Sequence, residues 1–160
     1  MSKRLIAMLA GAMAIAIVAA GCGSSSDDST GATGALTKVE FIKQGDAICK
    51  KGSEQIQGEA NAFARENNID TSKPTKAQQE EVIAGVLGPA LQDQADEISA
   101  LGAPAGEEGK TEAIVDALEA GAEELEEDPA SLLEGKSGAG PLSKANELAV
   151  KFGFKECGQE

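Results

Sequence analysis

The chain has 160 residues, a formal net charge of −13 at neutral pH, and neither His, Trp nor Tyr. The absence of His excludes Ser-His-Asp and Cys-His catalysis, imidazole metal ligands and a histidine pH switch. Carboxylates are therefore the main catalytic groups left. The acidity separately disfavours nucleic-acid binding, which needs clustered Lys and Arg.

The N-terminal segment predicts a signal peptide. It has a basic start, followed by an apolar stretch over residues 5–20. This stretch is shorter than the roughly 20 residues that span a membrane, and its length suits the apolar part of a signal peptide.

The apolar stretch ends in Val18-Ala19-Ala20-Gly21-Cys22. This run resembles a bacterial lipoprotein signal, although Ala19 stands where Leu is usual. The resemblance implies that residues 1–21 are removed and that Cys22 is acylated, for instance with palmitate. The protein would then be anchored by lipid to the cell membrane, on its extracytoplasmic side. Ordinary secretion and an uncleaved anchor are the alternatives.

Residues 22–35 predict a flexible tether, because after the cysteine they consist of Gly, Ser, Thr, Ala and Asp without apolar periodicity. A helical pattern begins at Leu36. Residues 36–160 are therefore expected to form one helical domain, large enough to bury a single core.

The first helix is predicted to begin after Thr37. Thr37 and Glu40 have the spacing of a capping box, with Leu36 and Phe41 in the hydrophobic-staple positions, and the pattern ends near residues 67–68. Apolar and small residues at three- and four-residue spacing form its inner face. They are Phe41, Gly45, Ile48, Gly52, Ile56, Ala60 and Phe63.

Gly45 and Gly52 lie on this inner face, although a glycine inside a helix costs about 1 kcal/mol relative to alanine. Close approach by a neighbouring helix is the expected reason. A ligand that touches the bare backbone is the alternative.

A second helix is predicted from Thr75, which forms another capping box with Gln78, to Leu101. Its interior contains Gly88-Pro89. Because proline cannot donate to the carbonyl of Gly85, a kink is expected there. The kink either bends the helix around its core or shapes a pocket.

Gly102 and Pro104 are stop signals for the second helix. Apolar spacing and turn residues predict the later elements, and no segment alternates like a strand. These elements are a helix over 108–127, a short helix over 128–133 capped by Asp128, a loop over 135–140, and a helix from Pro141 to Gly153 with a Schellman cap.

The pattern predicts an all-α fold, a four-helix bundle-like domain with a core poor in aromatic residues. Cys49 and Cys157 are expected to clasp it with one disulfide, which would stabilise it by about 4–5 kcal/mol through loss of chain entropy in the unfolded state. A catalytic or metal-binding pair is the rival interpretation. It would need CxxC spacing or further His or Cys ligands, which are missing.

Two acidic groups are candidate cation sites, because a calcium ion would relieve their repulsion. Neither belongs to an Asp-x-Asp-x-Asp-Gly loop, so we interpret both as solvated surface and predict no catalytic residue, no metal ligand and no cofactor. The groups are Glu119, Glu123, Glu126, Glu127 and Asp128, and Asp93, Asp96 and Glu97.

Three segments carry a family resemblance: VEFIKQGDAIC at 39–49, LGAP at 101–104 and FKEC at 154–157. They are similar to small uncharacterised actinobacterial lipoproteins with an F-x-x-x-A-D-A-I-C-type opening, from which Gly45 departs. The resemblance implies a lipid-anchored helical domain and assigns no activity.

We therefore expect a non-catalytic binding or scaffold protein of the cell envelope, with a protein or small molecule as its partner. A carboxylate-based envelope hydrolase is the alternative. It would require two acidic residues that face each other across a pocket.

Overall fold

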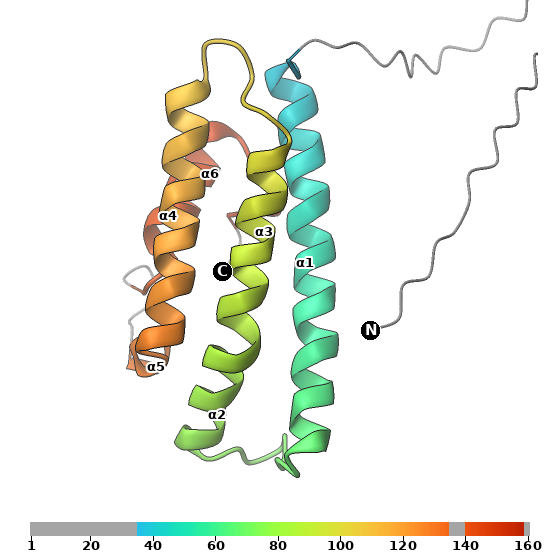
Figure 1. Cartoon of the computed structure of the whole chain (residues 1–160), viewed down its shortest axis with the longest axis vertical. Coiled ribbons are helices and arrows are strands. Elements are labelled where there is room, and N and C mark those ends of the chain that lie inside the picture. Colours follow the sequence, from blue (N-terminus) through green and yellow to red (C-terminus); the bar gives the residue numbers. More distant parts are fainter. Residues whose placement is uncertain (1–34, 135–139, 159–160) are drawn as a thin grey trace, which may run out of the picture. The chain divides into compact units, whose positions relative to one another are not determined.

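A computed structural model of the protein describes residues 35–134 and 140–158 (Figure 1). All regular elements in these two ranges are helices, which confirms the predicted all-α fold. In chain order they are α1 (Lys38–Glu66), α2 (Lys76–Val82), the π-helical turn η1 (Ile83–Leu87), α3 (Gly88–Ala100), α4 (Glu108–Glu127), α5 (Ala130–Glu134) and α6 (Ser143–Phe152).

The capping box at the start of α1 is confirmed. The Thr37 side chain accepts a hydrogen bond from the Glu40 N–H, and the Glu40 carboxylate accepts one from the Thr37 N–H at 2.9 Å. Hydrogen bonds from the Thr37 side chain and then from its backbone lower the pKa of Glu40. The helix ends at Glu66 with Asn67 as its C-cap, close to the end near residues 67–68 that the sequence predicts.

The second predicted helix contains a π-helical turn. The capping box of Thr75 and Gln78 is present, and α2, η1 and α3 follow one another as one continuous coil (Figure 1). In η1 the N–H of Gly88 donates to the carbonyl of Ile83, five residues back. The wider turn accommodates the ring and the missing N–H of Pro89. The irregularity thus lies over the five residues before the predicted kink position.

Helix α4 has the predicted bounds, whereas α6 begins two residues after its predicted start. Pro141 and Leu142 form a turn against α4 instead. A Cβ atom at Gly121 of α4 would lie only 2.8 Å from the Pro141 carbonyl oxygen. The chain therefore packs directly on the α4 backbone before it turns into α6. Of the predicted loop, residues 135–139 lie outside the described residues.

The predicted Schellman cap of α6 is confirmed. Gly153 has a left-handed backbone with φ of 119°, its N–H donates to Val150, and the N–H of Phe154 donates to Ala149 at 3.0 Å. The cap directs Phe154 into the core, where it is buried.

The helices lie in the order α1, α3, α4, α6, each beside the next (Figure 1). Their core has two parts. We name the first the aromatic region, whose buried residues are Phe41, Cys49, Ala95, Ile98, Ile114, Val115, Ala149, Phe152 and Phe154. We name the second the aliphatic region, whose buried residues are Ile83, Leu91, Ala122 and Leu125.

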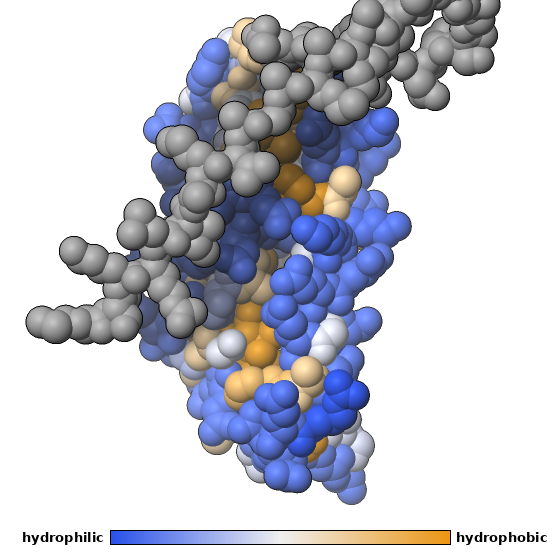
Figure 2. Space-filling view, turned by 45° about the vertical axis from the view of Figure 1, so that its right-hand side comes forward, coloured by the Kyte–Doolittle hydropathy of each residue, from blue (hydrophilic) through white to orange (hydrophobic). Residues whose placement is uncertain are grey.

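The surface in Figure 2 is mainly hydrophilic, and hydrophobic residues show as a narrow strip between hydrophilic flanks. Among the described residues, none of the helices combines the length and the apolar character needed to cross a bilayer.

Candidate functional site

The predicted disulfide is present. It joins Cys49 of α1 to Cys157, which follows α6, across a sequence separation of 108 residues and a Cα–Cα distance of 5.2 Å. Cys49 is buried in the aromatic region. The two cysteines therefore serve as a structural clasp.

Asp46 holds the same C-terminal segment through hydrogen bonds. Its Oδ1 accepts from the backbone N–H of Lys155 at 2.9 Å and of Glu156 at 2.8 Å. The sequence prediction missed this role, although Asp46 lies within the motif that carries the family resemblance. The carboxylate fixes the backbone just before Cys157, beside its disulfide partner on α1.

Three phenylalanines meet beneath this clasp. The ring centroids of Phe41, Phe152 and Phe154 lie 5.5 to 5.8 Å apart. A Cβ atom at Gly45 would overlap the ring of Phe154. Close approach therefore explains the glycine, but the approaching group is a side chain that follows α6 and not a helix backbone.

A charged cluster covers the edge of the aromatic region. The Lys38 ammonium lies 4.3 Å from the centroid of the Phe152 ring and 3.1 Å from a carboxylate oxygen of Glu107. Hydrogen bonds from Lys110 and then from Lys38 lower the pKa of Glu107. These contacts join the start of α1 to the start of α4 and to the Phe152 ring.

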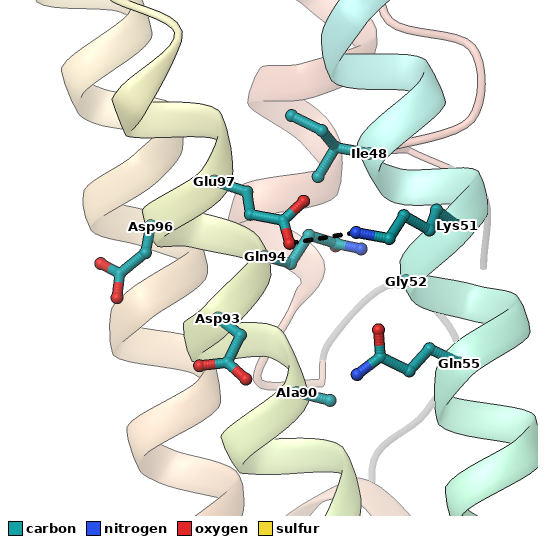
Figure 3. Close-up of a pocket in the computed structure, with 9 residues that line it drawn as sticks. All are labelled: Ile48, Lys51, Gly52, Gln55, Ala90, Asp93, Gln94, Asp96 and Glu97. Atoms are coloured by element: carbon teal, nitrogen blue, oxygen red, sulfur yellow. Dashed lines mark hydrogen bonds and ion pairs between the residues drawn. The ribbon is translucent and has the colours of Figure 1, made fainter. Parts of the chain in front are cut away.

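The candidate site is a groove between α1 and α3, with a volume of about 280 Å³ (Figure 3). Helix α1 contributes one wall and α3 the other, and the lining is largely polar. The lining residues are Ile48, Lys51, Gly52, Gln55, Ala90, Asp93, Gln94, Asp96 and Glu97.

One ion pair crosses the groove, between the Lys51 ammonium and Glu97 at 3.4 Å. In Figure 3 the Asp93 carboxylate lies over α3 itself, Asp96 points away from the α1 wall, and only Glu97 reaches across to α1. All three carboxylates come from α3. The opposite wall presents an ammonium and an amide group.

Gln94 forms the floor of the groove and is only 9% exposed. Its amide nitrogen donates to the carbonyl of Cys49 at 3.5 Å. A Cβ atom at Gly52 would overlap this nitrogen, so the predicted close approach to Gly52 is present. The approach brings a polar side chain of α3 against the backbone of α1.

The two predicted acidic groups differ in position. Asp93, Asp96 and Glu97 are brought to the groove, whereas the group at the end of α4 lines none of it. Within residues 35–134 and 140–158, no three His, Cys, Asp or Glu side chains are arranged to hold a metal ion. The lipidation candidate Cys22 lies outside these ranges.

Lys51, Gln55 and Gln94 are groove residues that the sequence prediction missed. The sequence contained a signal for Lys51 and Gln55. These two residues are four apart on α1 and so lie on one face of the helix, as Asp93 and Glu97 do on α3. Sequence spacing marks such pairs as neighbours on one helix, but it does not show which pair on another helix they oppose.

A comparison of the chain with models of protein families, with curated proteins and with solved structures found no match.

Proposed function

We propose that the protein is an extracytoplasmic lipoprotein whose helical domain binds a ligand or partner at the cell envelope without catalysing a reaction. The observation that carries the proposal is the Cys49–Cys157 disulfide. Structural disulfides form and persist mainly in oxidising, extracytoplasmic compartments. Since the chain has three cysteines, this pairing leaves Cys22 for the lipid that its surrounding sequence suggests.

The groove supports binding more than hydrolysis. A carboxylate pair for glycoside hydrolysis flanks the scissile bond from two sides. Here the carboxylates of Asp93, Asp96 and Glu97 share the α3 wall, and α1 contributes Lys51 and Gln55. Such a lining offers charge and hydrogen-bond acceptors for recognition, and the family resemblance to actinobacterial lipoproteins assigns no reaction.

Metabolic labelling with a palmitate analogue tests the anchor. We expect label on the wild-type protein expressed in a bacterium that processes lipoproteins, recovery in the membrane fraction, and loss of both in Cys22→Ser. A variant Cys22→Ser that keeps its label would contradict the assignment, as would wild-type protein without label.

The state of the cysteines gives a second test. In intact protein, alkylation before reduction should leave Cys49 and Cys157 unmodified, and alkylation after reduction should modify both. Reactivity of either residue before reduction, measured by mass spectrometry of the peptides, would remove the observation on which the proposal depends.

A further inference from the structure

We propose that the Cys49–Cys157 bond closes and opens by thiol–disulfide exchange at Cys157, and that Asp46 is the positioning residue for this exchange. The exchange partner is, by chemical class, a disulfide oxidant for closing and a thiol reductant for opening. In the proposed function the bond serves only as a clasp, so this chemistry lies beyond it.

The two cysteines differ in access. Cys49 is 4% exposed and belongs to the buried aromatic region, whereas Cys157 is partly exposed and packs against this region. In an exchange a thiolate must reach one sulfur of a disulfide, so the rate depends on access as well as on the acidity of the thiol. A partner in solution therefore reaches Cys157 more readily than Cys49.

Contacts other than the disulfide hold Cys157 near Cys49. We name residues 153–157 the C-terminal strap. Gly153 turns the chain at the end of α6, and the buried Phe154 ring packs on Gly45 of α1. Neither contact requires the covalent bond. We therefore expect the strap of the reduced protein to stay docked on α1.

Asp46 sets the position of the strap on α1. It lies three residues before Cys49, and residues at this spacing lie on one face of a helix. Its Oδ1 accepts from the N–H groups of Lys155 and Glu156 at 2.9 and 2.8 Å, and the N–H of Cys157 itself lies 3.5 Å away. One carboxylate oxygen thus holds three successive backbone positions that end at Cys157. It places Cys157 on the face of α1 that carries Cys49 before any bond forms.

Closing takes two exchanges, in which atoms and electrons balance. The Cys157 thiolate attacks one sulfur of the oxidant, whose other half leaves as a thiolate and takes up the proton that Cys157 released. The Cys49 thiol then loses its proton and attacks the Cys157 sulfur in the mixed disulfide, and the second half of the oxidant leaves as a thiol. The two protein thiols thereby lose two electrons and two protons to the oxidant. Opening is the reverse, with the first attack of the reductant on the Cys157 sulfur.

The separation of the cysteines along the chain makes positioning important. Without a docked strap, the second exchange depends on a chance encounter of two residues that are 108 positions apart. The effective concentration of two linked groups falls as the connecting chain lengthens. Asp46 replaces this search by a fixed geometry. Its loss should lower the effective concentration of the two thiols about tenfold, as for one charge-assisted hydrogen bond.

Reduction of the oxidised, folded protein tests which sulfur is attacked. The protein is the full chain with Cys22→Ser, which leaves only Cys49 and Cys157. After brief incubation with reduced glutathione and quenching in acid, mass spectrometry of the peptides locates the glutathione. We expect at least about tenfold more on Cys157 than on Cys49 in the folded protein, and less than about a twofold difference in urea. Equal labelling in the folded protein, or the same preference in urea, would overturn the assignment of Cys157.

Equilibration with mixtures of reduced and oxidised glutathione tests Asp46. In the same Cys22→Ser chain, the fraction of oxidised protein gives the effective concentration of the two thiols. Asp46→Ala should lower this value about tenfold, and Asp46→Asn, which keeps an oxygen acceptor, should lower it less than about threefold. The matched control is the exposed Asp116→Ala on α4, which should change it less than about twofold.

The same equilibration in urea separates positioning from a direct effect of Asp46 on the thiols, because native contacts are absent there. We expect Asp46→Ala to match the parent chain in urea. A loss of the same size in urea, or an unchanged effective concentration in folded Asp46→Ala, would overturn the positioning role.

Circular dichroism checks the state of the reduced protein. The reduced parent chain should keep the helices of the oxidised one. A reduced chain without them would also overturn the proposal, because no docked strap would remain. None of these tests depends on acylation of Cys22, which the labelling experiment examines separately.

Discussion

The aromatic region and the aliphatic region stabilise neighbouring parts of one bundle by different means. The aromatic region contains three of the four phenylalanines and adjoins the disulfide and the hydrogen bonds of Asp46. The aliphatic region has no aromatic residue among its buried residues, which are Ile, Leu and Ala. There the helices approach closely, since a Cβ atom at Gly88 of α3 would lie 3.3 Å from the Ala122 carbonyl oxygen of α4.

The difference shows how a chain whose only aromatic residues are four phenylalanines places them: three lie in the aromatic region and none among the buried residues of the other. Helix α6 is short, and the segment that follows it is held to α1 by packed phenylalanine rings and by the disulfide. Where α3 and α4 run side by side, aliphatic side chains fill the core, and Gly88 lets the α3 backbone approach the α4 backbone. The two regions should therefore respond differently to changes in covalent linkage, side-chain volume and charge.

The largest effect is expected from removal of the disulfide. The double variant Cys49→Ala, Cys157→Ala should lose about 4–5 kcal/mol of unfolding free energy, because the unfolded chain gains the entropy of a loop spanning 108 residues. Urea denaturation measures the loss. Hydrogen exchange should show that amides of α6, whose Ala149 and Phe152 lie in the aromatic region, lose protection before those of η1. Equal loss in both regions would show that they form one cooperative unit.

A pair of glycine substitutions on α1 compares a filled position with an open one. Gly45→Ala should destabilise by about 1–3 kcal/mol, because its methyl group overlaps Phe154. Gly58→Ala is the matched control. Apart from the backbone of its own helix turn, no atom lies within 4 Å of its Cβ position, so it should stabilise by about 0.5–1 kcal/mol. Thermal and urea denaturation of the two variants measure both values, and equal signs would contradict the packing.

Asp46→Ala should cost about 1.5 kcal/mol, because the N–H groups of Lys155 and Glu156 lose a charged acceptor. The exposed Asp116→Ala is its control and should cost less than about 0.5 kcal/mol. The cost at Asp46 should be measured by urea denaturation with the disulfide intact and after reduction. If the cost of Asp46→Ala is the same before and after reduction, the carboxylate and the disulfide hold residues 155–157 independently.

The smallest effect concerns Glu107 at the edge of the aromatic region. Its pKa is lowered by Lys110 and then Lys38, so its folded pKa lies below its unfolded pKa. The stabilisation is therefore present above the ordinary pKa of Glu and is lost as the pH falls through the folded pKa. Thermal denaturation should show a smaller decrease between about pH 7 and about pH 3 for Glu107→Gln than for wild type. An identical decrease would exclude this contribution.

Features encoded within a few residues could be predicted from the sequence. The capping boxes at Thr37 and Thr75 depend on side chains three residues from their partners, and the Schellman cap depends on Gly153. The Cys49–Cys157 pair could be predicted from elimination, because no other cysteine remained once Cys22 was assigned to lipid.

Features that depend on distant contacts could not be predicted. Asp46 meets backbone groups more than 100 residues away, and Gln55 faces the Asp93 turn only through the register of two helices. Pro89 predicted a kink in the second helix. It did not predict the π-helical turn of η1, because that turn depends on how the helix accommodates the proline ring. The start of α6 depends on Pro141 packing against Gly121.

The disulfide has a further consequence for resistance to proteolysis. Every residue between Cys49 and Cys157, including α2 to α6, lies inside one covalent ring. A protease that cuts the chain once within residues 135–139 would leave both fragments joined, and α6 would stay attached to α1. Under the proposed anchoring, a single cut would shed the whole domain from the membrane only if it fell between Cys22 and Cys49.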